Sequence, residues 1–391
     1  MNDLSRLLEA LSLAHTDGQD AVIATVVKVE GSAYRRPGAR MVIPQLGGAT
    51  GTVSGGCLES DVSKKAWWLT ASGKPVIRTY STGEDDDDLE DAELSFGLGC
   101  NGTVHILFER TSVQTPSLAI KVLKQVQASA RPAALATVIG SESERQTALG
   151  ERVALDADGT LELHMQDRLL GQTIAADLQT VLDAEKSAIR SYESHSGPIQ
   201  VLLEYVPAPR RLVIFGAGHD AVPLVNMAHL QGWHTTVIDA RTHFARPERF
   251  PDADQVSALP LQPFAGMQAL VDDAAVVVMT HSYTQDRHWL GQVLALQPRY
   301  IGQLGPRSRT ERLLDEMSSE TRQLPAFATL HYPVGLDLGG DTPACVALSI
   351  LAEINAVLNR RSGGMLKHRQ ASIHAADVMM AGETGLLKSG S

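Results

Sequence analysis

The sequence predicts an α/β protein in which an N-terminal mixed α+β domain is followed by a Rossmann-like doubly wound parallel-sheet domain. Three observations support this prediction. After residue 211, strand-like and helix-like segments alternate regularly, which is typical of a parallel sheet covered on both faces. The stretch VIFGAGHDA at residues 213–221 places a glycine-rich turn between a β-branched run and a helical pattern. Before residue 206, strands and helices are mixed without such alternation.

The N-terminal elements follow from apolar periodicity. Leu4, Leu7, Leu8 and Leu11 form one apolar stripe and predict a helix, and AVIATVVKV at 21–29 is β-branched and predicts a strand. From Cys57 onward, apolar residues at four-residue spacing predict a helix that ends near Gly73. Further strands are expected at 39–44, 50–53, 75–80 and 103–108, and residues 116–206 add two helices and several strands. No internal repeat of fixed period is evident.

The segment VPAPRR at 206–211 is the expected domain boundary, because two prolines in four residues suit a short, stiff linker. The predicted domains are 1–206 and 211–360, with a loose tail at 361–391. Strands are expected at 212–215, 235–239, 274–280 and 300–304, and helices at 219–231, 286–296, 307–317 and 343–358.

Composition limits the classes of partner. The chain has 391 residues, 43% of them hydrophobic, and a net charge of −11 without any segment rich in Lys or Arg. This charge argues against nucleic acid or an anionic membrane as partner. The N-terminus does not resemble a signal peptide, and no run of about 18 apolar residues occurs. We therefore expect a cytoplasmic protein.

Two of the three cysteines lie between or beside glycines. Cys57 stands in SGGCLESD (54–61) and Cys100 in GLGCNG (97–102), whereas Cys345 is expected to be a small core residue. Three cysteines are too few for a disulfide framework. No spacing typical of a zinc site accompanies them. They are expected to be free thiols.

The position of Cys57 favours a functional thiol over a packing residue. A thiol at a helix start is exposed to the backbone dipole and to free N–H groups, which favour the thiolate. Gly55 and Gly56 leave room for a bulky ligand, and the arginines of RRPGAR could approach Cys57 and bind a phosphate. Soft thiolates at Cys57 and Cys100 suit molybdenum, copper or a sulfur atom in transit. The arginines are Arg35, Arg36 and Arg40.

The glycine loop predicts a site for a phosphate-bearing ligand. Gly216 and Gly218 let the backbone approach a pyrophosphate, and Asp239 closes the next strand, where an acid takes a ribose hydroxyl in NAD-binding proteins. The ligand is either NAD(P) or another phosphate-bearing molecule. His219 and Arg241 are candidate contacts, with ordinary surface roles as the alternative.

Other candidates lie at the carboxyl edge of the same predicted sheet. THSYTQD follows strand 274–280, so His281 and Asp286 are candidates for ligand contact or proton transfer, although Asp286 could also only cap the next helix. Arg307 and Arg309 start a helix at a position suited to phosphate. In DLGGDTPAC (337–345), the glycines, Asp341 or Thr342, and Pro343 are typical of a helix start.

Several of these motifs together resemble the XdhC/CoxI family. The N-terminal motifs are GSAYRRPGARMVI, GTVSGGCLESDV and GLGCNGTVHILFE. The C-terminal motifs are VIFGAGHDAVPLV, VIDARTHFARPERFPDAD, VVVMTHSYTQD, YIGQLGPRSR and PVGLDLGGDTPACVALSILAE. They occur in the family's order over residues 20–110 and 211–358.

The resemblance implies a maturation factor rather than a catalyst. Such a chaperone binds the molybdenum cofactor (molybdopterin) transiently, protects it while a cysteine desulfurase installs a sulfur ligand, and delivers it to a xanthine dehydrogenase-type apoenzyme. The family also implies a homodimer. The residues that match its motifs are Gly55, Gly56, Cys57, Glu59, Gly99, Cys100, Gly102, Gly216, Gly218, His219, Asp239, Arg241, His281 and Asp286.

Two features depart from the usual pattern of the family. Pro343 is followed by Ala344 where relatives commonly carry a glutamate, and the acidic run at 84–93 is longer than usual.

Two other functions are alternatives to the chaperone. One is an NAD(P)-dependent oxidoreductase with His281 as proton donor. The other is a redox or regulatory protein with a reversible Cys57–Cys100 disulfide. The paired thiols favour the chaperone, because hydride transfer does not need them.

Overall fold

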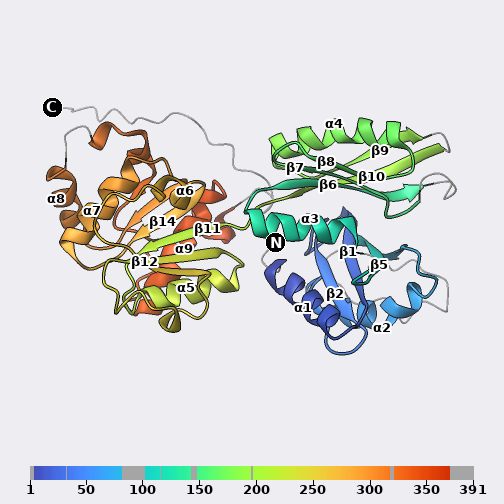
Figure 1. Cartoon of the computed structure of the whole chain (residues 1–391), viewed down its shortest axis with the longest axis horizontal. Helices are drawn as coiled ribbons and strands as arrows, with labels where there is room; N and C mark the ends of the chain where they lie inside the picture. The colour runs from blue at the N-terminus through green and yellow to red at the C-terminus, as the bar shows by residue number, and fades with distance from the viewer. Residues whose placement is uncertain are drawn as a thin grey trace. The chain divides into compact units, whose positions relative to one another are not determined.

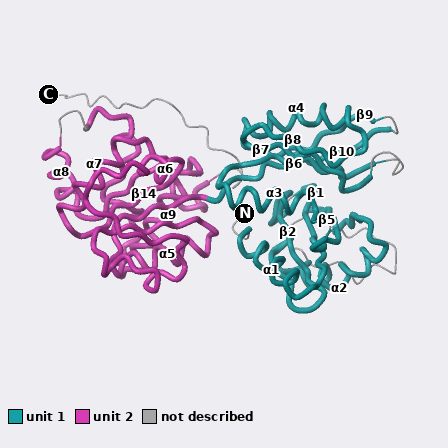
Figure 2. Tube along the Cα trace, in the orientation of Figure 1, with its two compact units in different colours: residues 1–209 teal, residues 210–391 magenta. Residues whose placement is uncertain are grey.

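The computed structural model describes residues 4–31, 33–81, 102–114, 116–141, 148–194, 197–317 and 321–369. The chain divides into two compact units, residues 1–209 and 210–391 (Figure 2). The division falls within the VPAPRR segment. No helix among the described residues is both long enough and apolar enough to span a membrane.

Unit 1 begins with a five-stranded antiparallel sheet, sheet A, with strand order β3-β2-β1-β5-β4. Two of its strands, β1 and β2, are buried on both faces, and successive residues pack in different cores: Ile23 and Val42 on one face, and Ala24 and Ile43 on the other. The elements in chain order are α1 Leu4–Thr16, β1 Ala21–Gly31, β2 Arg40–Pro44, β3 Thr50–Gly51, α2 Glu59–Leu69, β4 Val76–Tyr80 and β5 Gly102–Thr111.

The second half of unit 1 has the same architecture. Sheet B is antiparallel with strand order β8-β7-β6-β10-β9, and its helices occur at the same two points in the chain order (Figure 1). Its elements are α3 Leu118–Ser129, β6 Ala133–Ser141, β7 Arg152–Asp156, β8 Leu161–His164, α4 Arg168–Ala184, β9 Ala188–Ser194 and β10 Gly197–Val206.

Unit 1 is therefore built from two copies of one module, residues 4–111 and 118–206. The strand pairings, the helix positions and even a β-bulge correspond, because the ladder of β1 skips Val27 and that of β6 skips Ile139. Equivalent residues of the two copies are 112 positions apart through most of the module, as for Arg40 and Arg152 (152 − 40 = 112). At the last strand the difference falls to 95, as for Glu109 and Glu204 (204 − 109 = 95). The sequence shows no repeat of fixed period, and the structure reveals a duplication whose spacing changes along the chain. The two copies share a fold and few residues, and the shift in spacing hides a fixed period.

The copies pack face to face around a shared core. Helices α1 and α3 contact each other and pack with the inner faces of both sheets, whereas α2 covers the outer face of sheet A and α4 that of sheet B (Figure 1). The sheets meet directly where the bulge residues Val27 and Ile139 pack with Leu107 and Leu202. These four residues are two equivalent pairs, so the contact is close to two-fold symmetric.

Two reciprocal ion pairs link the copies. Arg40 of β2 binds Glu204 of β10 through two hydrogen bonds of 2.7 and 2.6 Å, and Arg152 of β7 binds Glu109 of β5 in the same way at 2.7 and 2.5 Å. All four side chains are at least 90% buried. Burial lowers the pKa of Arg40, but Glu204 outweighs burial and raises it. Each copy thus supplies one arginine and one glutamate to the other.

Unit 2 is a doubly wound sheet of six parallel strands in the order β13-β12-β11-β14-β15-β16. Helices α5 and α9 pack on one face, and α6, α7 and α8 contribute to the core on the other. The predicted fold class is confirmed. The elements are β11 Arg211–Phe215, α5 Ala221–Leu230, β12 His234–Asp239, β13 Gln255–Ala258, α6 Met267–Val271, β14 Ala274–Val278, α7 Tyr283–Leu294, β15 Tyr300–Gln303, α8 Arg307–Asp315, β16 Leu330–His331 and α9 Pro343–Leu358.

The sequence prediction missed three short elements of unit 2, namely β13, α6 and β16, because each has five residues or fewer and no clear period. Single-turn 3₁₀ helices also occur at Pro247–Arg249, Thr321–Gln323, Pro325–Thr329 and Leu366–His368.

Candidate functional site

Cys57 lies in the loop that leads into α2, not in the helix. The helix begins at Glu59, with Leu58 as its N-cap, so the predicted helix start at Cys57 is two residues too early. Gly56 explains the difference, since its φ of +113° is a left-handed conformation that glycine adopts readily. Among the described residues, no other atom lies within 4 Å of where a β-carbon of Gly56 would be. The backbone beside the thiol therefore faces open space.

A hydrogen-bond network fixes the shape of this loop. The Glu59 carboxylate accepts the backbone N–H groups of Val53 and Ser54 at 3.1 and 2.9 Å, and the Ser54 hydroxyl at 2.6 Å. Ser54 Oγ in turn accepts the N–H groups of Gly56 and Leu58. Burial raises the pKa of Glu59, but the hydrogen bonds from Ser54 and Val53 outweigh burial and hold the pKa below its ordinary value.

The same network reaches the thiol. Cys57 Sγ lies 3.5 Å from Ser54 Oγ and donates to it, and the Ser54 hydroxyl donates to Glu59. The thiol is therefore oriented by a chain of hydrogen bonds that ends at the Glu59 carboxylate. Sequence reasoning missed Ser54. The only signal for it was its place two residues before the Gly-Cys pair.

A small pocket opens in front of this loop. Arg35 and Tyr34 form one wall, and the Cys57 loop and β5 form the rest. The Tyr34 ring is exposed and lies about 3.5 Å from where a β-carbon of Gly55 would be. The pocket is lined by Ala33, Tyr34, Arg35, Val53, Ser54, Gly55, Cys57, Leu58, Gly102 and Val104.

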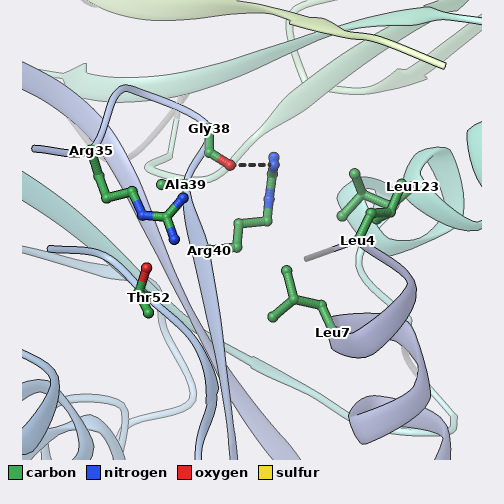
Figure 3. A pocket seen from close by; sticks show the side chains of 8 residues that line it. All are labelled: Leu4, Leu7, Arg35, Gly38, Ala39, Arg40, Thr52 and Leu123. Atoms are coloured by element: carbon green, nitrogen blue, oxygen red, sulfur yellow. Dashed lines mark hydrogen bonds between the residues drawn. The ribbon is translucent and has the colours of Figure 1, made fainter. Parts of the chain in front are cut away.

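The three predicted arginines have different surroundings. Arg35 lines the Cys57 pocket, Arg36 is exposed, and Arg40 is buried in its ion pair with Glu204. Arg35 also lines a second cavity of about 40 Å³ on the other side of the same turn (Figure 3). Of these three arginines, Arg35 is therefore the one that shares a pocket with the thiol. Cys100 and the acidic run 84–93 lie outside the described residues.

The glycine loop of unit 2 joins β11 to α5 as predicted. Gly216 has a φ of +125°, and a β-carbon on it would lie 2.4 Å from the carbonyl oxygen of Met279, at the end of β14. The sequence requires glycine here for close packing of two loops. His219 is exposed in this loop, and Gly218 is buried.

Asp239 is already engaged at the end of β12. Its carboxylate accepts the N–H of Ala217 at 2.9 Å and two hydrogen bonds from the Arg241 guanidinium at 2.9 and 2.8 Å. Asp239 is fully buried, and Arg241 stacks on the Phe244 ring at 4.0 Å. Burial raises the pKa of Asp239, but Arg241 and Ala217 outweigh burial and lower it. Asp239 stands where NAD-binding proteins carry the acid that holds a ribose, but here its carboxylate is bound by Arg241.

Two further candidates lie where β14 ends. The exposed His281 has a left-handed φ of +58°, and its Nε2 lies 2.6 Å from the Asp220 carboxylate of the glycine loop. Asp286 is buried and binds Thr280, Gln303 and Arg309. Asp286 therefore holds the loop that presents His281. Sequence reasoning missed Asp220, which directly follows His219.

The remaining candidates are at helix starts. Arg307 is exposed at the first position of α8 and stacks on Tyr332. Thr342 caps α9 by accepting the N–H of the half-buried Cys345, with Pro343 in the first turn. Over the described part of the chain, no cluster of three or more His, Cys, Asp or Glu side chains is arranged to hold a metal ion.

Fold and site together define a class of protein: a β-rich unit that carries a glycine-flanked cysteine pocket, fused to a Rossmann-like unit. Residues 14–81 match the XdhC and CoxI family, and residues 212–354 match the XdhC Rossmann domain. The chain belongs to the XdhC/CoxI family, as its motifs predicted.

Relatives resemble the chain over nearly its whole length. A Bacillus subtilis protein, named as a probable xanthine dehydrogenase subunit, is 32% identical over 90% of this chain and 97% of its own length. The Escherichia coli "Molybdenum cofactor insertion chaperone PaoD" is 24% identical over 87% of this chain and 84% of its own. A Bacillus halodurans crystal structure described as a xanthine dehydrogenase has a TM-score of 0.71 at 28% identity, and covers 95% of this chain and 98% of its own.

Proposed function

We propose that this protein is a molybdenum cofactor-binding chaperone for a xanthine dehydrogenase-type molybdenum hydroxylase. The observation that carries the proposal is the Cys57 pocket, which brings together a thiol, the Arg35 side chain and the exposed Tyr34 ring. The names of two relatives, a cofactor insertion chaperone and a probable xanthine dehydrogenase subunit, support the same function.

The residues of the pocket fit the chemistry of this cofactor. A thiolate is a soft ligand that suits molybdenum or its sulfur ligands. The guanidinium of Arg35 suits the phosphate of the pterin. Gly56, directly before the thiol, has no other described atom within 4 Å of where its β-carbon would be, so that side of the loop leaves room for part of a ligand.

The Ser54–Glu59 network fixes the orientation of the Cys57 thiol. The thiol donates to Ser54 and the Ser54 hydroxyl donates to Glu59, so the side chain is held in place before a ligand binds. We propose that Cys57 holds the cofactor transiently while a cysteine desulfurase supplies the sulfur ligand, and that the chain acts as a homodimer when it delivers the cofactor to the apoenzyme.

The engagement of Asp239 argues against the alternative function, an NAD(P)-dependent oxidoreductase. An NAD ribose would have to displace the two hydrogen bonds from Arg241 to reach this carboxylate. We propose that the glycine loop instead takes the phosphate of a ligand without using Asp239 as a ribose acceptor.

The test is activation of a xanthine dehydrogenase-type enzyme in cells that carry the wild-type chain, Cys57→Ala or the control Cys345→Ala. Because Cys345 lies outside the pocket, C345A is expected to support wild-type enzyme activity, and C57A to abolish it. Full activation by C57A, at normal levels of folded protein, would refute the proposal.

A further inference from the structure

We infer that Glu204, which belongs to the second copy of the module, positions the wall of the Cys57 pocket in the first copy. The wall is the turn at residues 33–39, which carries Tyr34 and Arg35. Glu204 does not line the pocket. It acts through Arg40, the residue directly after the turn, and is therefore a positioning residue of the site.

The contacts between Glu204 and the turn are direct. Arg40 donates one hydrogen bond to the Gly38 carbonyl at 2.8 Å and two to the Glu204 carboxylate. Gly38 itself has a φ of +95°, and a β-carbon on it would lie 2.7 Å from Glu204 Oε1. Glu204 thus binds the arginine that fixes the turn and lies close against Gly38, where it leaves no room for a side chain.

Packing alone does not hold the turn from behind. The cavity on its inner side has room for about 40 Å³ of free space, and Arg35 and Gly38 line it (Figure 3). Leucines of α1 and α3 line the opposite side of the cavity. Thr52 lies on the side of Arg35 (Figure 3), and its buried hydroxyl oxygen has no hydrogen-bond partner among the described residues. The backbone holds one end of the turn, because the Gly38 N–H donates to the Val26 carbonyl and the Ala39 carbonyl accepts the Val26 N–H, both at 2.8 Å. Since loosely packed side chains have free space to move into, we expect the position of the rest of the turn to depend on the Arg40–Glu204 pair.

The second copy provides a matched control. There, Arg152 donates to the Gly150 carbonyl at 3.1 Å and pairs with Glu109, as Arg40 does with Gly38 and Glu204. Both ion pairs are equally buried and lie between the same sheets. Leu169, 112 residues after Cys57, lies in the first turn of α4, so the position equivalent to Cys57 offers no thiol. Loss of either pair should affect stability alike, and only loss of the first should alter the cysteine pocket.

The experiment compares two alkylating reagents on the full-length chain. The rates at which anionic iodoacetate and neutral iodoacetamide modify Cys57 are measured by mass spectrometry of the peptide that contains it. The ratio of the two rates reports how well a positive charge is held beside the thiol, and changes in general exposure affect both rates alike. Arg35→Gln gives the ratio without the Arg35 charge.

We expect Glu204→Gln to lower the ratio about fivefold, towards the value for R35Q, as is typical of one charge acting over a few ångströms in a wet pocket. Glu109→Gln should leave the ratio unchanged within about twofold, a difference well below the effect of one such charge. Because a lone buried arginine can unfold the protein, the double variants R40M/E204L and R152M/E109L, which replace each pair by apolar residues, repeat the comparison in a folded chain.

An unchanged ratio in folded R40M/E204L, or an equal fall in both double variants, would overturn the inference. It rests on the proposed function only in treating Cys57 as the functional thiol. Alkylation needs neither cofactor nor client enzyme, so a failure here is distinguishable from a failure of C57A to affect enzyme activation.

Discussion

The two copies within unit 1 share a frame and differ in chemistry. Both have the same strand order, the same bulge and a buried arginine held by the other copy. In the first copy, Gly56 and Cys57 lie in a loop before α2, whereas the equivalent residues of the second copy, Arg168 and Leu169, already form the first turn of α4. Leu169 is 70% exposed. The module tolerates either a loop or a helical turn here, so the cysteine site is an addition to a stable module and not a requirement of its fold.

The largest expected effect tests whether the copies are energetically equivalent. Arg40→Met and Arg152→Met each leave a buried glutamate without its partner, which costs about 3–5 kcal/mol of unfolding free energy. The two losses should be equal, and the double variants R40M/E204L and R152M/E109L should lie close to the wild type. Urea denaturation of all four variants measures this. Unequal losses of unfolding free energy in R40M and R152M would show that the two copies are similar in fold but not in energy.

The next effect compares the glycines that precede the two arginines. Gly38 and Gly150 have φ values of +95° and +80°, so alanine at either position costs about 1–2 kcal/mol in a left-handed conformation. Gly38→Ala should cost more, because its β-carbon would lie 2.7 Å from Glu204, whereas the nearest atom to that of Gly150→Ala is 3.0 Å away. Thermal denaturation of the two variants shows which one is less stable. A larger loss of stability in G150A than in G38A would contradict the inferred contact between Glu204 and Gly38.

A smaller effect is specific to the first copy and depends on pH. The folded-state pKa of Glu59 is depressed, so its contribution is present above the unfolded value of about 4.5 and is lost as pH falls through the lower folded value. Glu59→Gln should cost about 1 kcal/mol at pH 7, a modest figure because the carboxyl is only partly buried. Stability of wild type and E59Q, measured from pH 7 to pH 3, should converge at the acid end. A difference in stability that stays constant with pH would show that the ionised carboxylate of Glu59 does not stabilise the loop.

The smallest effect is expected at the position equivalent to Cys57. Leu169→Ala removes an exposed side chain and should change the unfolding free energy by no more than about 0.5 kcal/mol. The same variant should leave enzyme activation in cells at the wild-type level. A loss of activation in L169A, with stability unchanged, would show that the second copy also contributes a working site.

The sequence predicts the parts of this molecule that depend on local pattern. The Rossmann-like unit follows from alternating apolar runs and from the glycines around Ala217, and the cysteine loop follows from the glycines before Cys57. The duplication has no local signal, since sheet pairing depends on side-chain volume and burial, which many residues satisfy. The two copies could be recognised only after β10 was seen beside β6.

The environment of the site residues was equally hidden. Arg40 and Glu204 are 164 residues apart, and nothing in RRPGAR indicates which arginine is buried. The Ser54–Glu59 network depends on a left-handed Gly56 that turns the loop back on itself. Asp220 pairs with His281 only because Gly216 lets the ends of β11 and β14 approach closely.

We propose that the cofactor binds at one of two equivalent positions, the loop that carries Cys57, and not at the start of α4 that carries Leu169. The direct measurement is molybdenum and pterin bound per full-length chain, after purification from a molybdenum-replete host, for the wild type, C57A and L169A. We predict at most one equivalent in the wild type and in L169A, and none in C57A. Retention of the cofactor by C57A, or two equivalents per chain in the wild type, would contradict the account.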